Sequence, residues 1–76
     1  NPDKYINMVE VFKTNITNKQ IADEITEQFQ MLFPHFKINF DLSDCDNILR
    51  VESENNEIEF ITQKITSLGY NCEPLE

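Results

Sequence analysis

The spacing of apolar residues changes its period at Pro34, and this change constrains the fold more than any other feature of the chain. Before Pro34, one stripe of apolar residues recurs about every 3.6 residues, at Ile21, Ile25, Phe29 and Leu32. After it, apolar residues alternate with polar ones, at Phe36, Ile38, Phe40 and Leu42. The sequence therefore predicts an amphipathic helix, ending near Phe33 because proline disfavours helical geometry at the preceding residue, and then a half-buried strand.

The start of this first helix is marked by two local signals. Thr17 is followed three residues later by Gln20, the spacing of a capping box. Ile16 stands where it would pack on Ile21 as a hydrophobic staple. We therefore expect Thr17 to cap the helix.

Three further strands complete the predicted sheet. Residues 8–14 are β-prone, and either Val9 and Val11 or Met8 and Phe12 would face inward. Residues 43–47 have the composition of a turn, and residues 48–52 then return as a strand with Arg50 outward and Leu49 and Val51 inward. A short strand over residues 70–73 is expected last, with Pro74 tolerated only at an edge.

A second helix lies between the third and fourth predicted strands. Asn55 or Asn56 would cap it, and Glu59 would complete a box with Asn56. Its apolar stripe is Ile58, Ile61, Ile65 and Leu68. Gly69 follows as the expected left-handed residue that ends a helix.

The element order βαββαβ is that of the ferredoxin-like split βαβ pattern. It predicts an α+β fold, with a four-stranded antiparallel sheet in the order 4-1-3-2 and two helices on one face. Seventy-six residues make one domain. We expect a flexible lead-in over residues 1–7, the domain over residues 8–74 and a tail over residues 75–76.

Two short segments carry a family resemblance. Ile16-Thr17 before the first helix, and the ending Ile65-x-x-Leu68-Gly69-Tyr70 of the second, resemble the heavy-metal-associated domain family over residues 8–74. That family is metallochaperone-like, and its Met-Thr-Cys-x-x-Cys loop holds a soft metal ion. Here Asn18 and Ile21 occupy the two cysteine positions. The resemblance thus implies the scaffold without its soft-metal site.

The predicted topology gathers polar residues at one end of the molecule, where the resembled family binds metal and docks partners. They come from the start of the first helix, the turn between the second and third strands, and the loop after the second helix: Thr17, Asn18, Lys19, Asp44, Cys45, Asp46 and Tyr70. Thr17, Asn18, Lys19 and Tyr70 are candidates for binding a partner. Asp44, Cys45 and Asp46 are the candidates if a metal ion is bound with atypical ligands.

Other patterns give no catalytic constellation. Cys45 and Cys72 fall on opposite edges of the predicted sheet, farther apart than the roughly 7 Å between Cα atoms that a disulfide allows, so we expect two free thiols. His35 is the only histidine and lies at the opposite end from Cys45. A chain with a single glycine has no phosphate-cradling loop. We therefore expect neither an enzyme nor a cofactor.

The acidic composition narrows the class of partner. Fourteen Asp and Glu against six Lys and Arg give a net charge of −8, which disfavours binding to nucleic acid or to an anionic membrane. Two cysteines suit a reducing, cytoplasmic setting. The sequence favours a non-catalytic module that binds a protein or a second copy of itself. The alternative is a metal-binding or metal-transfer protein.

Overall fold

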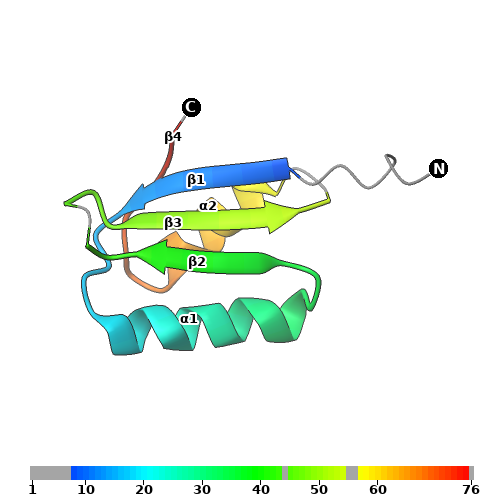
Figure 1. Ribbon diagram of the computed structural model, residues 1–76, viewed down its shortest axis with the longest axis horizontal. Helices are drawn as coiled ribbons and strands as arrows, with labels where there is room; N and C mark the ends of the chain where they lie inside the picture. The colour runs from blue at the N-terminus through cyan, green and yellow to red at the C-terminus, as the bar shows by residue number, and fades with distance from the viewer. Residues whose placement is uncertain (1–7, 44, 55–56, 76) are drawn as a thin grey trace.

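The computed structural model describes residues 8–43, 45–54 and 57–75, so the predicted lead-in lies outside the described residues. The fold is α+β, with a four-stranded antiparallel sheet and two helices, an arrangement compatible with a ferredoxin-like fold (Figure 1). The elements follow in this order: β1 (Met8–Thr14), α1 (Lys19–Leu32), β2 (Lys37–Asp41), β3 (Ile48–Ser53), α2 (Ile58–Ser67) and β4 (Cys72–Leu75).

The strands lie across the sheet in the order β2-β3-β1-β4, which is 4-1-3-2 when counted from the β4 edge. The central row of the register places Arg50 between Asn39 of β2 and Val11 of β1, and Val11 in turn beside Leu75 of β4. β2 and β3 are joined by a short turn, whereas β1 pairs with two strands that come much later in the chain. The two edges of the sheet are therefore β2 and β4.

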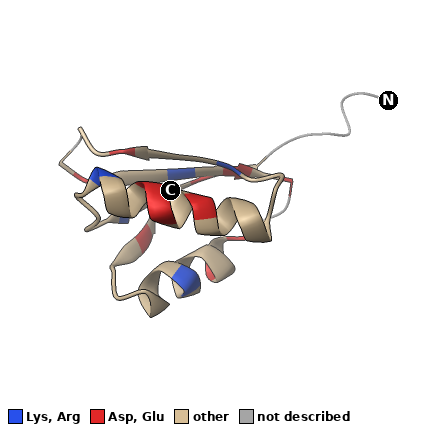
Figure 2. Cartoon of the chain, turned by 90° about the horizontal axis from the view of Figure 1, so that it is seen from below, with Lys and Arg blue, Asp and Glu red and all other residues tan. Residues whose placement is uncertain are grey.

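Only one face of the sheet is buried, and both helices cover it (Figure 2). Phe12, Leu49 and Val51 point into this layer and are fully buried. This confirms the predicted inward residues of β3 and settles the direction of β1, because Phe12 is buried while Val9 is 51% exposed. The opposite face, with Arg50 exposed, stays open to solvent.

The predicted cap of α1 is wrong by one residue. Asn18, not Thr17, caps the helix: its Oδ1 accepts hydrogen bonds from the backbone N–H of Gln20 at 2.7 Å and of Ile21 at 3.2 Å. Thr17 lies one position too early, since the helix begins at Lys19, and it is exposed.

The buried stripe of α1 also differs from the predicted one. It consists of Ala22, Ile25 and Phe29, with Ile21 half-buried. Leu32, expected in the stripe, is 55% exposed. The helix ends with Phe33 as its C-cap, as Pro34 predicts.

The two ends of α2 are built differently. Glu57 is the N-cap and its side chain makes no capping bond in the described chain, while the predicted caps at residues 55–56 lie outside the described residues. At the other end Gly69 adopts the predicted left-handed conformation, with φ 99°. The N–H of Gly69 donates to the carbonyl of Thr66 at 2.9 Å, and that of Tyr70 to Ile65 at 3.3 Å, the two bonds of a Schellman motif.

The last strand begins two residues later than predicted, at Cys72 instead of Tyr70. The Schellman motif explains the shift, because the backbone N–H of Tyr70 is bonded to the helix and cannot join the sheet. Pro74 lies within β4 at the edge of the sheet, where a residue without an N–H is tolerated.

Candidate functional site

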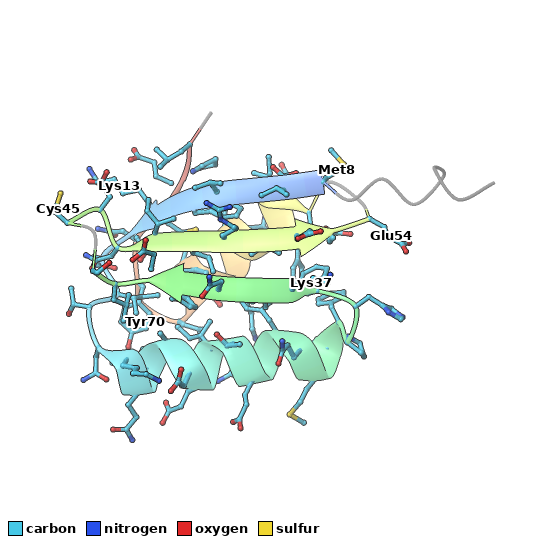
Figure 3. All side chains as sticks on the ribbon, in the orientation of Figure 1. Met8, Lys13, Lys37, Cys45, Glu54 and Tyr70 are labelled. Atoms are coloured by element: carbon cyan, nitrogen blue, oxygen red, sulfur yellow. The ribbon has the colours of Figure 1, made fainter. Side chains whose placement is uncertain are left out.

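Three connections meet at one end of the sheet, and we call this end the rim. It comprises residues 15–18 between β1 and α1, residues 42–47 between β2 and β3, and residues 68–71 between α2 and β4. Lys13, Cys45 and Tyr70 lie at this end, while Met8 and Glu54 lie at the other (Figure 3). The strand ends and the two helix ends therefore bring together the segments that the sequence singles out.

Thr14, the last residue of β1, anchors the β2–β3 turn. Its backbone N–H donates to the carbonyls of Asp46 and Asn47, and its Oγ1 donates to the carbonyl of Asn47 at 2.8 Å. The same Oγ1 accepts from the N–H of Ile16 at 3.1 Å. Asn47 has a φ of 49°, the left-handed conformation that asparagine tolerates better than most residues. Because Thr14 is only 5% exposed, these bonds hold two parts of the rim in a fixed relation.

Another hydrogen bond joins the α2–β4 connection to the β1–α1 connection. The N–H of Asn71, in the α2–β4 connection, donates to Oδ1 of Asn15, in the β1–α1 connection, at 2.8 Å. These two residues are far apart in the sequence, so the contact depends on the whole fold. It fixes the path that the chain takes from α2 into β4.

Beside this bond the rim contains an open cleft of about 510 Å³. Its lining combines residues from β1, α2 and the two adjoining connections with the start of β4: Lys13, Thr14, Asn15, Thr66, Tyr70, Asn71, Cys72 and Glu73. Nζ of Lys13 lies 3.9 Å from Oδ1 of Asp46, and both side chains are about half exposed, so this ion pair contributes little to stability. The cleft offers hydrogen-bond donors and acceptors around one aromatic ring.

Cys72 is the half-buried thiol of this cleft. Burial raises the pKa of Cys72 to about 11, and the neighbouring Thr62 hydroxyl only partly opposes the rise. That hydroxyl is buried and has no well-aligned hydrogen-bond partner in the described part of the chain. Burial thus disfavours the thiolate of Cys72, which is the form that soft-metal binding and nucleophilic attack require.

Two of the partner-binding candidates from the sequence, Tyr70 and Lys19, line different hollows. Tyr70 is half-buried and lines the cleft. Thr17 is exposed, and the Oδ1 of Asn18 is used by the helix cap. Lys19 lines a separate hollow between α1 and β2, where its Nζ lies 2.9 Å from Oδ2 of Asp23.

The residues proposed as atypical metal ligands differ in how far they are exposed to solvent. Asp44 lies outside the described residues. Cys45 is exposed and Asp46 is half-buried, and both belong to the β2–β3 turn. Cys45 and Cys72 are both free thiols. Within residues 8–43, 45–54 and 57–75, no three His, Cys, Asp or Glu side chains are grouped so that they could hold a metal ion.

Most of the cleft was missed by sequence reasoning. Lys13, Asn15 and Asn71 belong to no motif, and their common position arises only when β4 pairs with β1. One feature of the sequence could have indicated the cleft. Gly69 ends α2, and the strand that follows it pairs with β1, so residues 70–73 come to lie beside the last residues of β1. The pairing of Cys72 with Thr14 is the result.

Comparison with known proteins adds no relative to this picture. No family model, no curated protein and no solved structure matches the chain. None of the helices in the described part has the length and apolar content needed to cross a bilayer. The resemblance to heavy-metal-associated domains therefore rests on the sequence pattern alone.

Proposed function

We propose that this protein is a non-catalytic interaction module that binds a protein partner through the rim. The scaffold is a ferredoxin-like one resembling the heavy-metal-associated domain, from which the soft-metal site has been lost. The observation that carries the proposal is the cleft of about 510 Å³, which is lined by residues of β1, α2, β4 and two connections and is bordered by the hydrogen bonds of Thr14 and Asn15. Two free thiols suit a reducing, cytoplasmic setting.

Loss of the metal site is supported by what the two replaced positions now do. The Oδ1 of Asn18 is occupied by two backbone N–H groups of the helix. Ile21 packs against the hydrophobic core. Both positions thus serve the start of α1, and burial disfavours the thiolate form of Cys72 that a soft metal ion would bind.

The chemistry of the cleft suits a peptide segment with polar groups. Lys13, Asn15 and Glu73 present a cation, an amide and a carboxylate around the half-buried ring of Tyr70. Tyrosine is enriched at protein interfaces because it combines a large ring with a hydrogen-bonding tip. A polar segment carrying one apolar side chain would satisfy these groups.

Titration with metal ions separates this function from the metal-binding alternative. Reduced protein is titrated with Cu⁺, Zn²⁺ and Ca²⁺ while backbone amide shifts are followed by NMR. We expect no saturable change within residues 15–21 and 43–47. Saturable shifts at micromolar ion concentrations, confined to those residues, would overturn the proposal and favour metal binding.

Site-specific crosslinking tests for the partner directly. A photoreactive amino acid is placed at Asn71, in the cleft, and in a matched protein at Gln63, an exposed residue of α2. In an extract of the source cells we expect one discrete adduct from position 71 and none from position 63. The adduct should weaken when Lys13→Glu is added. Equal labelling from both positions, or no adduct from position 71, would contradict a rim interface.

A further inference from the structure

The two edges of the sheet differ in how well they are protected against pairing with another strand. β4 contains Pro74, which has no backbone N–H to offer a neighbour. β2 (Lys-Ile-Asn-Phe-Asp) contains neither proline nor glycine, and among the described strands it pairs with β3 alone. Unpaired backbone groups on such an edge are a template for an added strand. β2 is therefore the edge that favours association.

We propose that β2 binds β2 of a second copy of this chain, antiparallel and centred on Asn39, so that two sheets become one. The sequence of the strand is self-complementary in this arrangement. Lys37 lies opposite Asp41 of the second copy, Ile38 opposite Phe40, and Asn39 opposite its own counterpart. The two-fold axis repeats each unlike pair, which gives two ion pairs and two apolar pairs. Cross-strand pairs of both kinds stabilise antiparallel sheets.

The faces of β2 are consistent with this pairing. Lys37, Asn39 and Asp41 are exposed, whereas Ile38 and Phe40 are half-buried and pack against the core from the helix side. The ion pairs would thus lie on the solvent face of the joined sheet. The apolar pairs would lie on the helix side, where the present edge leaves these two side chains partly exposed.

A hollow beside the edge supplies room for the second copy. It has a volume of about 270 Å³ and lies between α1 and β2, lined by Ala22 and Thr26 of the helix and by Ile38 and Phe40 of the strand, among others. Ile38 and Phe40 of the second copy would enter this hollow.

The charge pattern selects the register. A shift of one residue would place every apolar side chain of the added strand on the wrong face. A shift of two residues would leave Lys37 or Asp41 opposite Asn39, so both ion pairs would be lost. The carboxylate of Asp41 is also held in place, since its Oδ1 accepts bonds from the N–H and the hydroxyl of Ser43. The pairing centred on Asn39 is the one in which charges, apolar residues and faces all agree.

This interface is separate from the proposed function of the rim. The cleft is lined by residues of β1, α2, β4 and their connections, and it shares no lining residue with the hollow beside β2. Self-association and partner binding can therefore succeed or fail independently, and each has its own experiment.

Charge reversal with a mixing step tests the pairing by sedimentation equilibrium. Lys37→Asp alone places like charges opposite one another twice, and so does Asp41→Lys alone. We expect each variant to self-associate at least about tenfold more weakly than the wild type. An equimolar mixture of the two variants restores both ion pairs, so the mixture should form heterodimers. The double variant Lys37→Asp/Asp41→Lys should self-associate like the wild type.

Two controls keep the test decisive. Glu27→Lys makes the same charge change as Asp41→Lys on the exposed surface of α1 and should leave self-association unchanged. Because Asp41→Lys removes the bonds to Ser43, the melting temperature of each variant is measured beside its association. If the wild-type chain stays monomeric up to about 1 mM, the proposal is wrong, and the β2 edge would instead be available to a strand of a different protein. A mixture that associates no better than its separate components also overturns the proposal.

Discussion

The two ends of the sheet are held together by different interactions. At the rim the connections are joined by hydrogen bonds, chiefly those of Thr14 to Asn47 and of Asn71 to Asn15. At the far end, by which we mean residues 29–36 and 57–60, they are joined by aromatic rings. The rim is polar and contains the cleft, whereas the far end is mainly apolar.

Four phenylalanines make the contacts at the far end. The ring of Phe33 stacks on that of Phe36, with centroids 4.6 Å apart, and meets the edge of Phe60 at 5.0 Å. Phe29 meets Phe60 edge to face at 6.3 Å. These rings link the end of α1, the start of β2 and α2 through burial of apolar area and through aromatic geometry.

Apolar burial at the far end and hydrogen bonding at the rim make different contributions to the domain. Apolar burial contributes about 25 cal/mol for each Å² removed from water and has little directional preference. A hydrogen bond contributes only about 1 kcal/mol net, because it replaces bonds to water, but it fixes direction. The far end therefore stabilises the domain, while the hydrogen bonds of the rim fix the positions of its polar groups.

The largest expected effect comes from the far end. Phe29→Ala removes a ring that is only 1% exposed, both from the core and from its contact with Phe60. We expect the free energy of unfolding, measured in urea, to fall by about 3–5 kcal/mol, through lost burial and the cavity left behind. Gln28→Ala, at an exposed neighbouring position of α1, serves as the control and should change stability little. A loss below about 1 kcal/mol for Phe29→Ala would break the comparison.

An intermediate effect is expected at the rim. Thr14→Val keeps the shape of the side chain but removes the hydroxyl that joins Ile16 to Asn47. The N–H of Ile16 loses its acceptor in a buried position, so unfolding in urea should show a loss of about 1–3 kcal/mol. Thr14→Ser retains the hydroxyl and should recover most of this stability. If Thr14→Val is as stable as the wild type while Thr14→Ser is not, the methyl group and not the hydrogen bonds holds the rim.

Features decided by local chemistry were predicted well from the sequence. The alternation around Arg50 places Leu49 and Val51 inward, as found, because a strand exposes successive residues on opposite faces. Gly69 ends α2 as predicted, since a left-handed residue suits glycine. In both cases the neighbouring residues alone determine the outcome.

Two features that depend on tertiary contacts, the cap of α1 and the cleft, were not predicted. Thr17 and Asn18 are both good caps by type, and the choice depends on how the chain leaves β1. Ile16 is buried and its N–H is tied to Thr14, so the chain reaches the helical direction only at Lys19, which makes Asn18 the cap. The cleft was missed for the same reason, since Asn15 and Asn71 meet only in the completed fold.

The smallest expected effect is a pH dependence that comes from Cys72, the half-buried thiol that lines the cleft. The pKa of Cys72 rises from its ordinary value of 9.0 to about 11 in the folded chain because burial disfavours the thiolate. Between these values the unfolded chain loses the thiol proton while the folded chain keeps it. The contribution of Cys72 to stability is therefore complete below about pH 9, declines as pH rises towards about 11, and stays constant above that.

Urea unfolding of the wild type, Cys72→Ala and Cys45→Ala at a series of alkaline pH values measures this decline. The wild type and Cys45→Ala should lose stability between pH 9 and pH 11 in parallel, while Cys72→Ala should lose less. We expect the difference to be smaller than the effect of Thr14→Val, since the thiol is only half-buried and water screens part of its charge. If all three curves coincide, burial does not raise the pKa of Cys72. A larger difference than that caused by Thr14→Val would mean that burial stabilises the rim as it stabilises the far end, and the contrast between the two ends would be lost.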